Sequence, residues 1–351
     1  ALTLPHVQLV VEGQDTRLAN LPDDASDPPG PLGPGATYFL NTRATTQGEP
    51  FLKRGFLTVR RSGLAATVGR FEYQDGLETE PADPTLAFLK RTRIAERLVG
   101  AFGFTHVSRS FDGGRLSLDR PDWNVTAMAL RPTQGGFEVS ANREIDGVGL
   151  AGLAVTLRRV PGSPPADVRF FYLYYDDRRD APVKADNDPK NDHGRIAVHS
   201  GGAHAVTVVD AGPGRVDALV WMVIQGGAWG RLNHRAWAYA LEAGYQLPRV
   251  PWEPWLRGGY NQSSGDDDPA DGHHGTFFPL IPTARIYAQL PFYNLMNVSD
   301  LFAELLLRPH RRVLVRTDYH WLQLTEHRDR WYAGSGAITA DGFGYTRARS
   351  G

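Results

Sequence analysis

The stretch VLVRTDYHWLQL, residues Val313–Leu324, alternates apolar and polar residues along its length. Side chains on a β-strand point to opposite faces in turn, so such a segment carries one apolar face and one charged face. The apolar face comprises Val313, Val315, Thr317, Tyr319 and Trp321. The opposite face comprises Arg316, Asp318 and His320. An apolar row that ends in aromatic residues, backed by charges, fits a wall between lipid and water.

Comparable extended segments follow one another along the chain with almost no helix between them. Ser62-Gly63 and Phe111–Gly114 are predicted turns, and Thr85–Arg97 is either a short helix or a loop. The predicted strands are Phe51–Arg61, Leu64–Tyr73, Leu98–Ser110, one beginning at Arg115–Leu118, Trp123–Leu130, Gly147–Val160, Asp167–Tyr175, Arg195–His199, Ala203–Val209, Val216–Ile224, Ala236–Tyr245, Trp255–Asn261, Thr283–Gln289, Leu301–Arg308, Val313–Leu324 and Trp331–Ile338.

The connections between these segments are of two kinds. Polar loops such as Asp75–Asp83, Asp176–Asn191 and Ser263–Gly275 alternate with short turns such as Ala211–Gly214 and Pro309–His310. Outer-membrane barrels show this asymmetry, with tight periplasmic turns and extended outer loops. We therefore predict an all-β fold: one transmembrane antiparallel β-barrel domain over residues 1–351, with about 16–18 strands. The alternative fold is a soluble all-β protein, either a propeller or a large sandwich.

Composition narrows the class of protein further. No apolar run approaches the roughly 18 residues of a transmembrane helix, which excludes a helical membrane protein. The absence of cysteine rules out disulfides and thiolate metal sites. The 8 Trp and 13 Tyr suit interfacial aromatic girdles. Because the net charge is -1, any positive surface must arise from local segregation of charge.

The two ends of the sequence carry weaker signals. Ala1–Leu4 shows no basic region followed by an apolar stretch, and Arg347–Gly351 is a polar tail where an aromatic-ended strand is usual. We expect further strands to flank this sequence at both ends.

Four segments, in order along the chain, resemble the alginate export family of bacterial outer-membrane porins. They are GRFEYQDGLE at Gly69–Glu78, ERLVGAFGFTHVSRSFDG at Glu96–Gly113, WNVTAMALRPTQGGFE at Trp123–Glu138, and the late block Phe292–Leu324. The resemblance implies an antiparallel barrel of about eighteen strands that lets an anionic polysaccharide, such as alginate, cross the bacterial outer membrane. It implies contacts with the lipid bilayer, lipopolysaccharide and periplasmic export components. Nucleic acid is not an expected partner, because basic residues do not run along a single helix.

Polyuronates carry about one carboxylate per sugar, so a pore that conducts them needs basic side chains along its interior. The planar fork of arginine pairs a carboxylate through two parallel hydrogen bonds, and interspersed acids would keep capture weak. Lys53 and Arg54 are adjacent on a predicted strand and are expected to point to opposite faces, with Arg54 inward. The predicted pore-lining residues are Arg54, Arg70, Glu72, Arg97, Arg109, Arg257, Asp300, Glu304, Arg308, Arg316, Asp318 and His320.

Several alternative interpretations stay open. Each inward arginine could belong to a structural ion-pair lattice instead of contacting substrate. The whole chain could be a general anion-selective porin for small acidic solutes, or a soluble β carbohydrate-binding protein. An outer-membrane hydrolase is a further alternative, because His106 and Ser108 share a strand face.

No enzyme, cofactor or metal site is expected. The sequence contains no nucleophile-elbow, phosphate-loop or dinucleotide-binding motif. Asp266–Asp268 with Asp271 lacks the spacing of a calcium loop and is interpreted as a solvated outer loop. His273-His274 would point to opposite faces of a strand.

Overall fold

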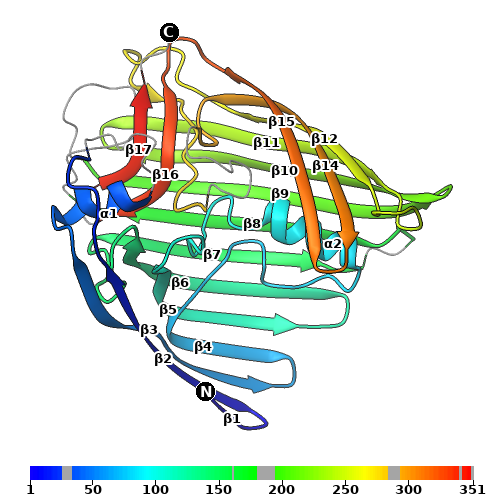
Figure 1. Ribbon diagram of the computed structural model, residues 1–351, viewed down its shortest axis with the longest axis horizontal. Helices are drawn as coiled ribbons and strands as arrows, with labels where there is room; N and C mark the ends of the chain where they lie inside the picture. Colours follow the sequence, from blue (N-terminus) through cyan, green and yellow to red (C-terminus); the bar gives the residue numbers. More distant parts are fainter. Residues whose placement is uncertain (26–33, 160–161, 180–193, 284–292, 340–341, 349–351) are drawn as a thin grey trace.

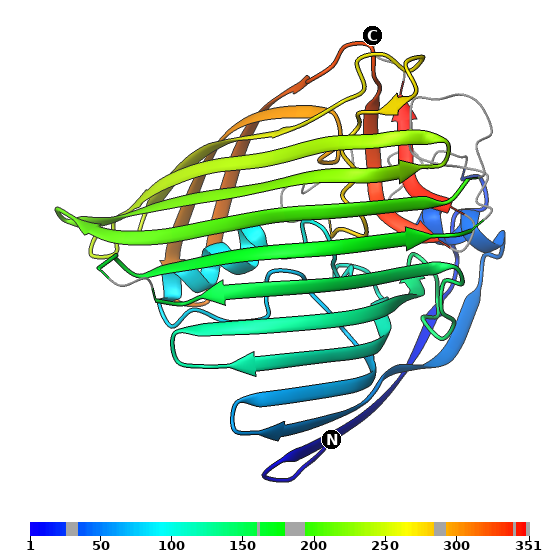
Figure 2. The same ribbon diagram turned by 180° about the vertical axis from the view of Figure 1, so that it is seen from behind.

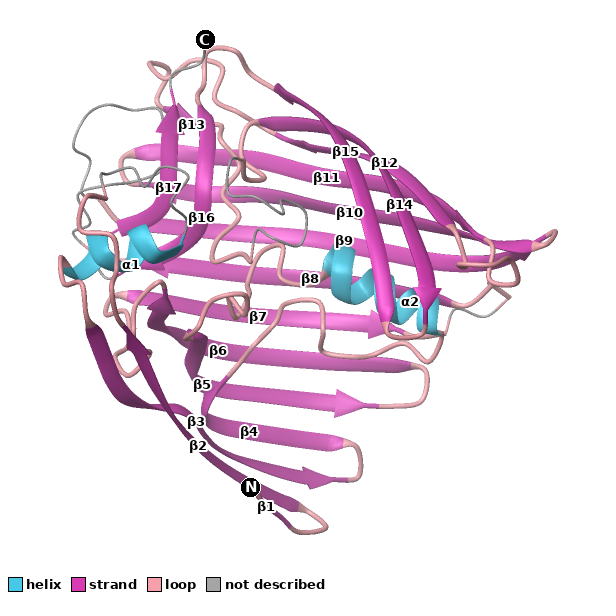
Figure 3. Cartoon of the chain, in the orientation of Figure 1, coloured by secondary structure: helices cyan, strands magenta, loops and turns pink. Residues whose placement is uncertain are grey.

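The computed structural model describes residues 1–25, 34–159, 162–179, 194–283, 293–339 and 342–348, and antiparallel β-sheet dominates them (Figure 3). One sheet of fifteen strands runs in chain order from β1 (Leu2–Thr3) to β15 (Val313–Leu324), each strand paired with the next. The exception is the two-residue β13 (His273–His274), which pairs with β11 in parallel. The seventeen described strands fall within the predicted number, and the predicted all-β antiparallel fold is confirmed.

The remaining strands of the large sheet are β2 (Val7–Leu18), β3 (Gln47–Arg61), β4 (Leu64–Phe71), β5 (Ser108–Asp119), β6 (Trp123–Gly136), β7 (Val148–Leu157), β8 (Ala166–Asp177), β9 (Ile196–Ala211), β10 (Gly214–Trp229), β11 (Leu232–Gln246), β12 (Trp255–Ser263) and β14 (Val298–His310). A separate hairpin consists of β16 (Trp331–Thr339) and β17 (Gly342–Ala348). The helices are α1 (Pro34–Thr42) and α2 (Pro84–Leu89), and α2 continues into a π-helical turn at Lys90–Ile94.

The sheet has a short-turn end and a long-loop end. The turns at residues 62–63, 120–122, 212–213 and 311–312 are tight, whereas residues 19–46, 72–107 and 264–297 connect strands at the opposite end. At the β3–β4 turn both Ser62 and Gly63 have positive φ, 50° and 82°. That geometry matches the right-handed twist of the flanking strands and closes the hairpin in two residues. The predicted asymmetry of turns and loops is present.

The two faces of each strand differ in chemistry. On β15 the exposed fractions of Tyr319 and Trp321 are 67% and 57%, while the side chains of Arg316, Asp318 and His320 on the opposite face are mostly covered. On β14 the outward residues are likewise apolar and exposed, and the inward ones are buried. The large apolar side chains exposed on other strands include Leu9, Val11, Leu57, Val68, Leu116, Phe170, Val220, Met222, Ile224, Leu241 and Leu256. The sheet therefore presents a continuous apolar exterior, of the kind that contacts lipid.

The interior is partly filled by two connections from the long-loop end. The first, residues 72–107, is called the inner segment; it carries α2, which lies between β8–β11 and the pair β14–β15 (Figures 1 and 2). The second, residues 264–283, pairs with it through a parallel bridge between Val99 and Ile281. Phe277, Phe278 and Ile281 are fully buried and belong to one apolar cluster with inward residues of β8–β10. The barrel interior is thus a packed assembly on the β8–β11 side.

Most predicted strands are confirmed, among them the Phe51–Arg61/Leu64–Tyr73 hairpin, and the helical alternative for Thr85–Arg97 holds for its first ten residues. Most of Thr283–Gln289 lies outside the described residues.

Two predictions around β5 are wrong. Leu98–Ser110 is not a strand over its length, because Leu98, Val99 and Phe102 are buried as part of the inner segment and β5 begins only at Ser108. Phe111–Gly114 is not a turn but the middle of β5. A side chain at Gly113 would lie 2.1 Å from the Ala129 carbonyl oxygen, so glycine here allows close strand approach instead of a reversal.

The expected break between Arg195–His199 and Ala203–Val209 is also wrong, since β9 runs through it. A Cβ on Gly202 would meet the Phe171 ring at 2.4 Å. The glycine therefore makes room for an aromatic side chain on the neighbouring strand and does not end the strand.

Candidate pore-lining site

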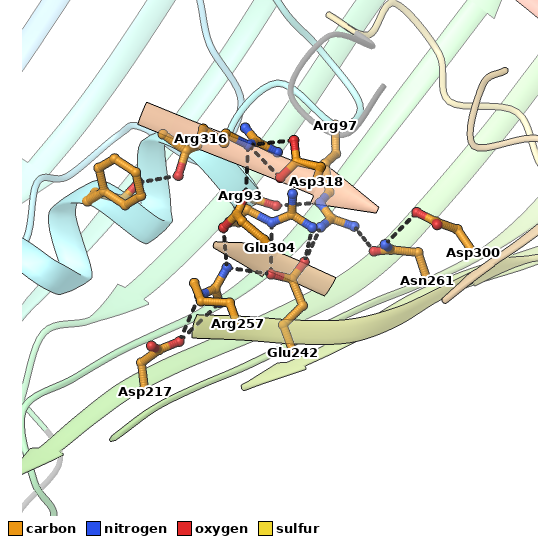
Figure 4. Close-up of polar contacts among 12 residues, drawn as sticks. Arg93, Arg97, Asp217, Glu242, Arg257, Asn261, Asp300, Glu304, Arg316 and Asp318 are labelled. Atoms are coloured by element: carbon orange, nitrogen blue, oxygen red, sulfur yellow. Dashed lines mark hydrogen bonds and ion pairs between the residues drawn. The ribbon is translucent and has the colours of Figure 1, made fainter. Parts of the chain in front are cut away.

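A buried ion-pair network joins the inner segment to the barrel wall (Figure 4). Its centre is Glu242 on β11, whose two carboxylate oxygens accept hydrogen bonds from Nε and Nη2 of Arg93, each 2.8 Å long. Arg97 Nη2 donates to the same carboxylate at 3.1 Å, and so does Arg257 Nη1, also at 3.1 Å. One wall carboxylate thus holds two arginines of the inner segment and one arginine of β12.

The network continues across the wall through Arg257 to β15. Arg257 donates to Asp217 of β10 at 3.0 Å and lies 3.7 Å from a carboxylate oxygen of Glu304. Glu304 in turn lies 2.7 Å from Nε of Arg316. Arg316 also pairs with Asp318 on its own strand, at 2.8 Å. Each of the two wall arginines, Arg257 and Arg316, is thus held by more than one carboxylate.

Strand register explains part of this arrangement. Arg257 on β12 lies directly opposite Glu304 on β14, whereas Glu304 lies opposite a second acid, Asp318 on β15. Arg316 pairs with both of these carboxylates. Directly opposed residues on neighbouring strands share a face and have close Cβ atoms, so opposite charges there stabilise one another. Because side chains alternate faces, these charges all face inward while the leucines between them face outward.

A branch of the network reaches His320. Asn261 accepts from Arg97 at 3.3 Å and donates to Asp300 at 3.2 Å. Asp300 also lies 2.9 Å from Nδ1 of His320, whose ring stacks on Phe302 with centroids 5.8 Å apart. The branch extends the polar inner wall toward the long-loop end.

The network is nearly dry and nearly neutral. The side chains of Arg93, Arg97, Arg257 and Glu242 are at most 1% exposed. Charges removed from water in this way must be paired closely. For Arg93, burial works to lower the pKa, but the Glu242 carboxylate outweighs it and holds the pKa well above its ordinary value. The network contains the four arginines Arg93, Arg97, Arg257 and Arg316, and the five acids Asp217, Glu242, Asp300, Glu304 and Asp318.

Two further clusters anchor the inner segment to β8. Lys90 donates to Asp167 at 2.8 Å, and Asp167 also contacts His204 at 2.9 Å. Arg169 donates to Asp75 at 2.6 Å and to Glu78 at 2.7 Å. With the central network, these contacts fix the inner segment along much of its length.

Seven of the twelve predicted pore-lining residues lie in this network: Arg97, Arg257, Asp300, Glu304, Arg316, Asp318 and His320. Of these, Arg316 is the most accessible, with 23% of its side chain exposed. The other five lie elsewhere.

Arg70 lies on the exposed apolar face of β4. It follows Val68 by two positions, so the two share a face, and Val68 is exposed. Its guanidinium pairs with Asp112, which lies opposite it on β5, at 2.5 Å. Arg70 therefore does not join the inward network, and Glu72, beyond the end of β4, pairs with Lys53 at 3.2 Å instead.

Lys53 and Arg54 do not point to opposite faces, contrary to expectation. The ladder between β2 and β3 shifts register so that Glu12 lies opposite Arg54 and Gly13 opposite Leu52, which leaves Lys53 as the extra residue of a bulge. Lys53 is buried and donates to the Val107 carbonyl at 2.6 Å, while Arg54 donates to Glu12 at 2.6 Å. A bulge places consecutive side chains on one face, which strict alternation cannot foresee.

The last two predicted residues lie near opposite ends of the sheet. Arg109 is fully buried at the start of β5, by the long-loop end. Arg308 is exposed at the short-turn end, 3.6 Å from Glu253.

The hydrolase alternative gains no support from the geometry. Ser108 Oγ contacts Lys53 and lies 3.4 Å from Glu72, while the His106 ring packs edge-on against Tyr38 at 5.9 Å. The serine thus has a lysine and a carboxylate as neighbours in place of a histidine base.

Sequence reasoning missed Arg93, Glu242, Asp217 and Asp167. Glu242 is the only charge in the β11 run AWAYALEAGY, and Asp217 stands alone at the start of ALVWMVI on β10. A single charge at an inward position of a long apolar strand is the signal that could have found them, because such a charge needs a buried partner.

The family of the chain follows from its sequence. The family model for alginate export matches residues 6–349, and the chain belongs to that family. It is an outer-membrane protein of the porin or exporter class, located in the bacterial outer membrane, as predicted. No helix among the described residues is long and apolar enough to span a membrane. No curated protein matches the chain.

Solved structures with a similar course of the chain include two from Pseudomonas aeruginosa. OpdK with vanillate is 11% identical, with 94% of this chain and 87% of that chain covered and a TM-score of 0.43. OccK8 (OprE) is 9% identical, with 99% of this chain and 86% of that chain covered and a TM-score of 0.45.

Proposed function

We propose that the protein conducts an anionic polysaccharide of the alginate type across the outer membrane, through the interior of a single barrel domain formed by residues 1–351. The observation that carries this proposal is the contrast between the two faces of β14 and β15. Leucine, tyrosine and tryptophan side chains are exposed on one face, and the charged pairs of Glu304, Arg316 and Asp318 line the other. Apolar residues outside and charges inside are what a conduit through lipid requires.

Conduction of a polymer requires the inner segment to move. Arg93 and Arg97 tie it to Glu242, so these guanidinium groups are already paired. An acidic polymer would compete with Glu242 for them, while Glu242 keeps Arg257 as a partner. The partly exposed Arg316 is the most accessible arginine of the network for such a polymer. Weak, repeated pairing of this kind suits a chain that must slide.

A second candidate is an anion-selective porin for small acidic solutes. It is favoured by the apolar packing of Phe277, Phe278 and Ile281 inside the barrel, which leaves less room for a polymer. Blockers of different length distinguish the two candidates. A short uronate and a long polyuronate should block a small-solute porin alike, whereas they should differ in their block of a polymer conduit.

A soluble carbohydrate-binding protein fits less well. It would leave Leu256, Tyr319 and Trp321, and many similar side chains, exposed to water over the whole outer face. Lipopolysaccharide around the long-loop end and periplasmic export components at the short-turn end are the partners that our proposal implies.

Reversal potentials in planar bilayers test the proposal. Arg316→Ala should reduce the preference for anions, because it removes the most accessible arginine of the buried network. Arg70→Ala is the control, since Arg70 is also an ion-paired strand arginine but lies on the outward face. An anion preference that is unchanged in Arg316→Ala, or lowered equally in both variants, would contradict the proposal.

A further inference from the structure

Six successive hairpin turns at the short-turn end, from β3–β4 to β14–β15, each carry at least one arginine. Residues 60–64, 119–123, 157–166, 210–215, 247–254 and 308–313 contain ten arginines and four carboxylates. We call these arginines the arginine ring: Arg60, Arg61, Arg120, Arg158, Arg159, Arg215, Arg249, Arg308, Arg311 and Arg312. A surface with such an excess of one sign concentrates ions of the opposite sign.

Three members of the ring occupy inward positions. Arg60 follows the buried Thr58 by two residues, and Arg158 follows the buried Thr156 in the same way. Arg215 precedes the buried Asp217 by two residues. Since side chains alternate faces, these three border the mouth of the barrel and not only its lipid-facing rim. Arg308 lies where the register of β14 shifts, between Leu307 and His310, so alternation does not assign its face.

The tip of the inner segment reaches this mouth. Arg215 Nη2 donates to Asp83 at 2.5 Å and Arg215 Nη1 donates to Thr85 at 2.9 Å. Thr85 in turn donates to Gln246, the last residue of β11, at 3.2 Å. Burial works to raise the pKa of Asp83, but the Arg215 hydrogen bond and the amide of Leu86 outweigh it, so the pKa lies below its ordinary value. A charged carboxylate of the protein thus occupies one arginine of the ring.

Other members of the ring are open to an incoming anion. Arg61, Arg159, Arg249, Arg311 and Arg312 are exposed, and no ion pair of theirs occurs among the described residues. Arg60 bonds only a neutral amide, that of Gln8, at 3.2 Å. The ring therefore combines guanidinium groups that have no ion pair among the described residues with three that carboxylates already pair: Arg158 with Asp119, Arg308 with Glu253, and Arg215 with both Asp210 and Asp83. Of these carboxylates, only Asp83 belongs to the inner segment.

We propose that the arginine ring is the docking site for the carboxylates of the polymer at the periplasmic mouth, and that Asp83 is an internal stand-in which the polymer displaces from Arg215. This inference rests on the proposed function. The exchange is chemically balanced, because one carboxylate replaces another on the same guanidinium and no proton moves. Displacement frees the N-terminal end of α2, whose amides at Thr85 and Leu86 bond to Asp83. Docking would thus detach the tip of the inner segment from the barrel mouth, while the contacts of Lys90, Arg93 and Arg97 still hold the rest of it.

Phosphates of inner-leaflet lipids offer the same anionic chemistry to arginines at this level of the membrane. The inward positions of Arg60 and Arg158, and the carboxylate of Asp83 that already pairs with Arg215, favour the polymer. The lipid alternative is an outcome of the test below.

The test uses the full chain, inserted from one side into planar bilayers of phosphatidylcholine, with a hexauronate as the probe and a neutral hexasaccharide as its control. The concentration of hexauronate that halves the current is measured from each side.

We expect hexauronate to block the wild type at lower concentration from the short-turn side. Arg60→Gln/Arg308→Gln should raise that concentration about tenfold, at roughly threefold for each exposed arginine. Asp83→Asn should lower it about threefold, because the competing charge is gone while asparagine still caps α2. Arg131→Gln, an exposed arginine paired with Glu144 near the long-loop end, is the matched control and should change nothing.

The outcomes separate this inference from the proposed function. Block of the wild type that is equal from both sides and unaffected by the ring substitutions overturns the ring but leaves the proposed function standing. If the ring substitutions change only binding to vesicles that contain phosphatidylglycerol, the ring anchors lipid and the inference fails. An Asp83→Asn variant with unchanged block overturns the role of Asp83. If hexauronate does not block the wild type at all, both proposals fall.

Discussion

Replacing Glu242 by glutamine should release the inner segment from the barrel wall. Glu242 accepts four hydrogen bonds from Arg93, Arg97 and Arg257, between 2.8 and 3.1 Å long, and all four side chains are at most 1% exposed. Glutamine keeps the shape but removes the charge, and its amide group cannot accept from all three donors. Breaking a buried pair by removing one partner costs about 3–5 kcal/mol. At about 1.4 kcal/mol per factor of ten, the population with a detached inner segment should rise about 10²- to 4 × 10³-fold.

Single-channel recording and hydrogen exchange read out this change. Glu242→Gln should open more often and for longer than the wild type, and residues 84–97 should exchange faster. Glu144→Gln is the matched control, since Glu144 pairs with the exposed Arg131 and such a pair contributes at most about 1 kcal/mol. If both variants show wild-type gating and wild-type exchange at residues 84–97, the network does not hold the inner segment and our reasoning about it is refuted.

Two further predictions concern the outer face and the outer loops. Tyr319→Lys, in the middle of β15, should destabilise the protein in vesicles by about 2–4 kcal/mol, whereas Val313→Lys at the strand end should cost about 0–1 kcal/mol. Urea titrations measure both losses of stability, and equal losses would contradict a lipid-facing row of side chains on β15. Burial and the nearby Asp329 raise the pKa of Asp266 from 3.8 to about 6, so the folded loop binds the proton more tightly than the unfolded chain does. The stability of the folded loop is therefore lowest above pH 6 and rises as the pH falls from 6 toward 4. Hydrogen exchange, corrected for intrinsic rates, should show stronger protection of loop 264–276 at pH 5 than at pH 7. Asp266→Asn should reduce this difference without abolishing it, because the pKa of Asp329, which accepts from the loop at Thr276, is raised as well.

The alternation of residues along single strands could be predicted because it is a local property. Val313–Leu324 shows its apolar and charged faces directly, and strand pairing preserves them. The same local rule found Arg257, Glu304 and Arg316, which lie on neighbouring strands in register.

The rest of the site depends on contacts between distant parts of the chain. Arg93 meets Glu242, 149 positions away, because the inner segment folds back into the barrel, and no periodicity marks such a return. The prediction for Arg70 failed for another reason. Alternation shows which residues, two positions apart, share a face of the strand, but it does not show which face points into the barrel. The bulge at Lys53 is a third kind of failure, since an extra residue in one strand changes the register without a clear sequence signal.

Labelling β15 residue by residue tests the central claim most directly. The chain contains no cysteine, so a single cysteine introduced at each position of Val313–Leu324 carries a unique nitroxide label. We expect oxygen dissolved in the lipid to relax labels at odd-numbered positions, such as Tyr319 and Trp321. We expect a water-soluble nickel chelate to relax labels at positions 316, 318 and 320. The absence of this alternation, or its reversal, would contradict the assignment of lipid outside and a polar interior within.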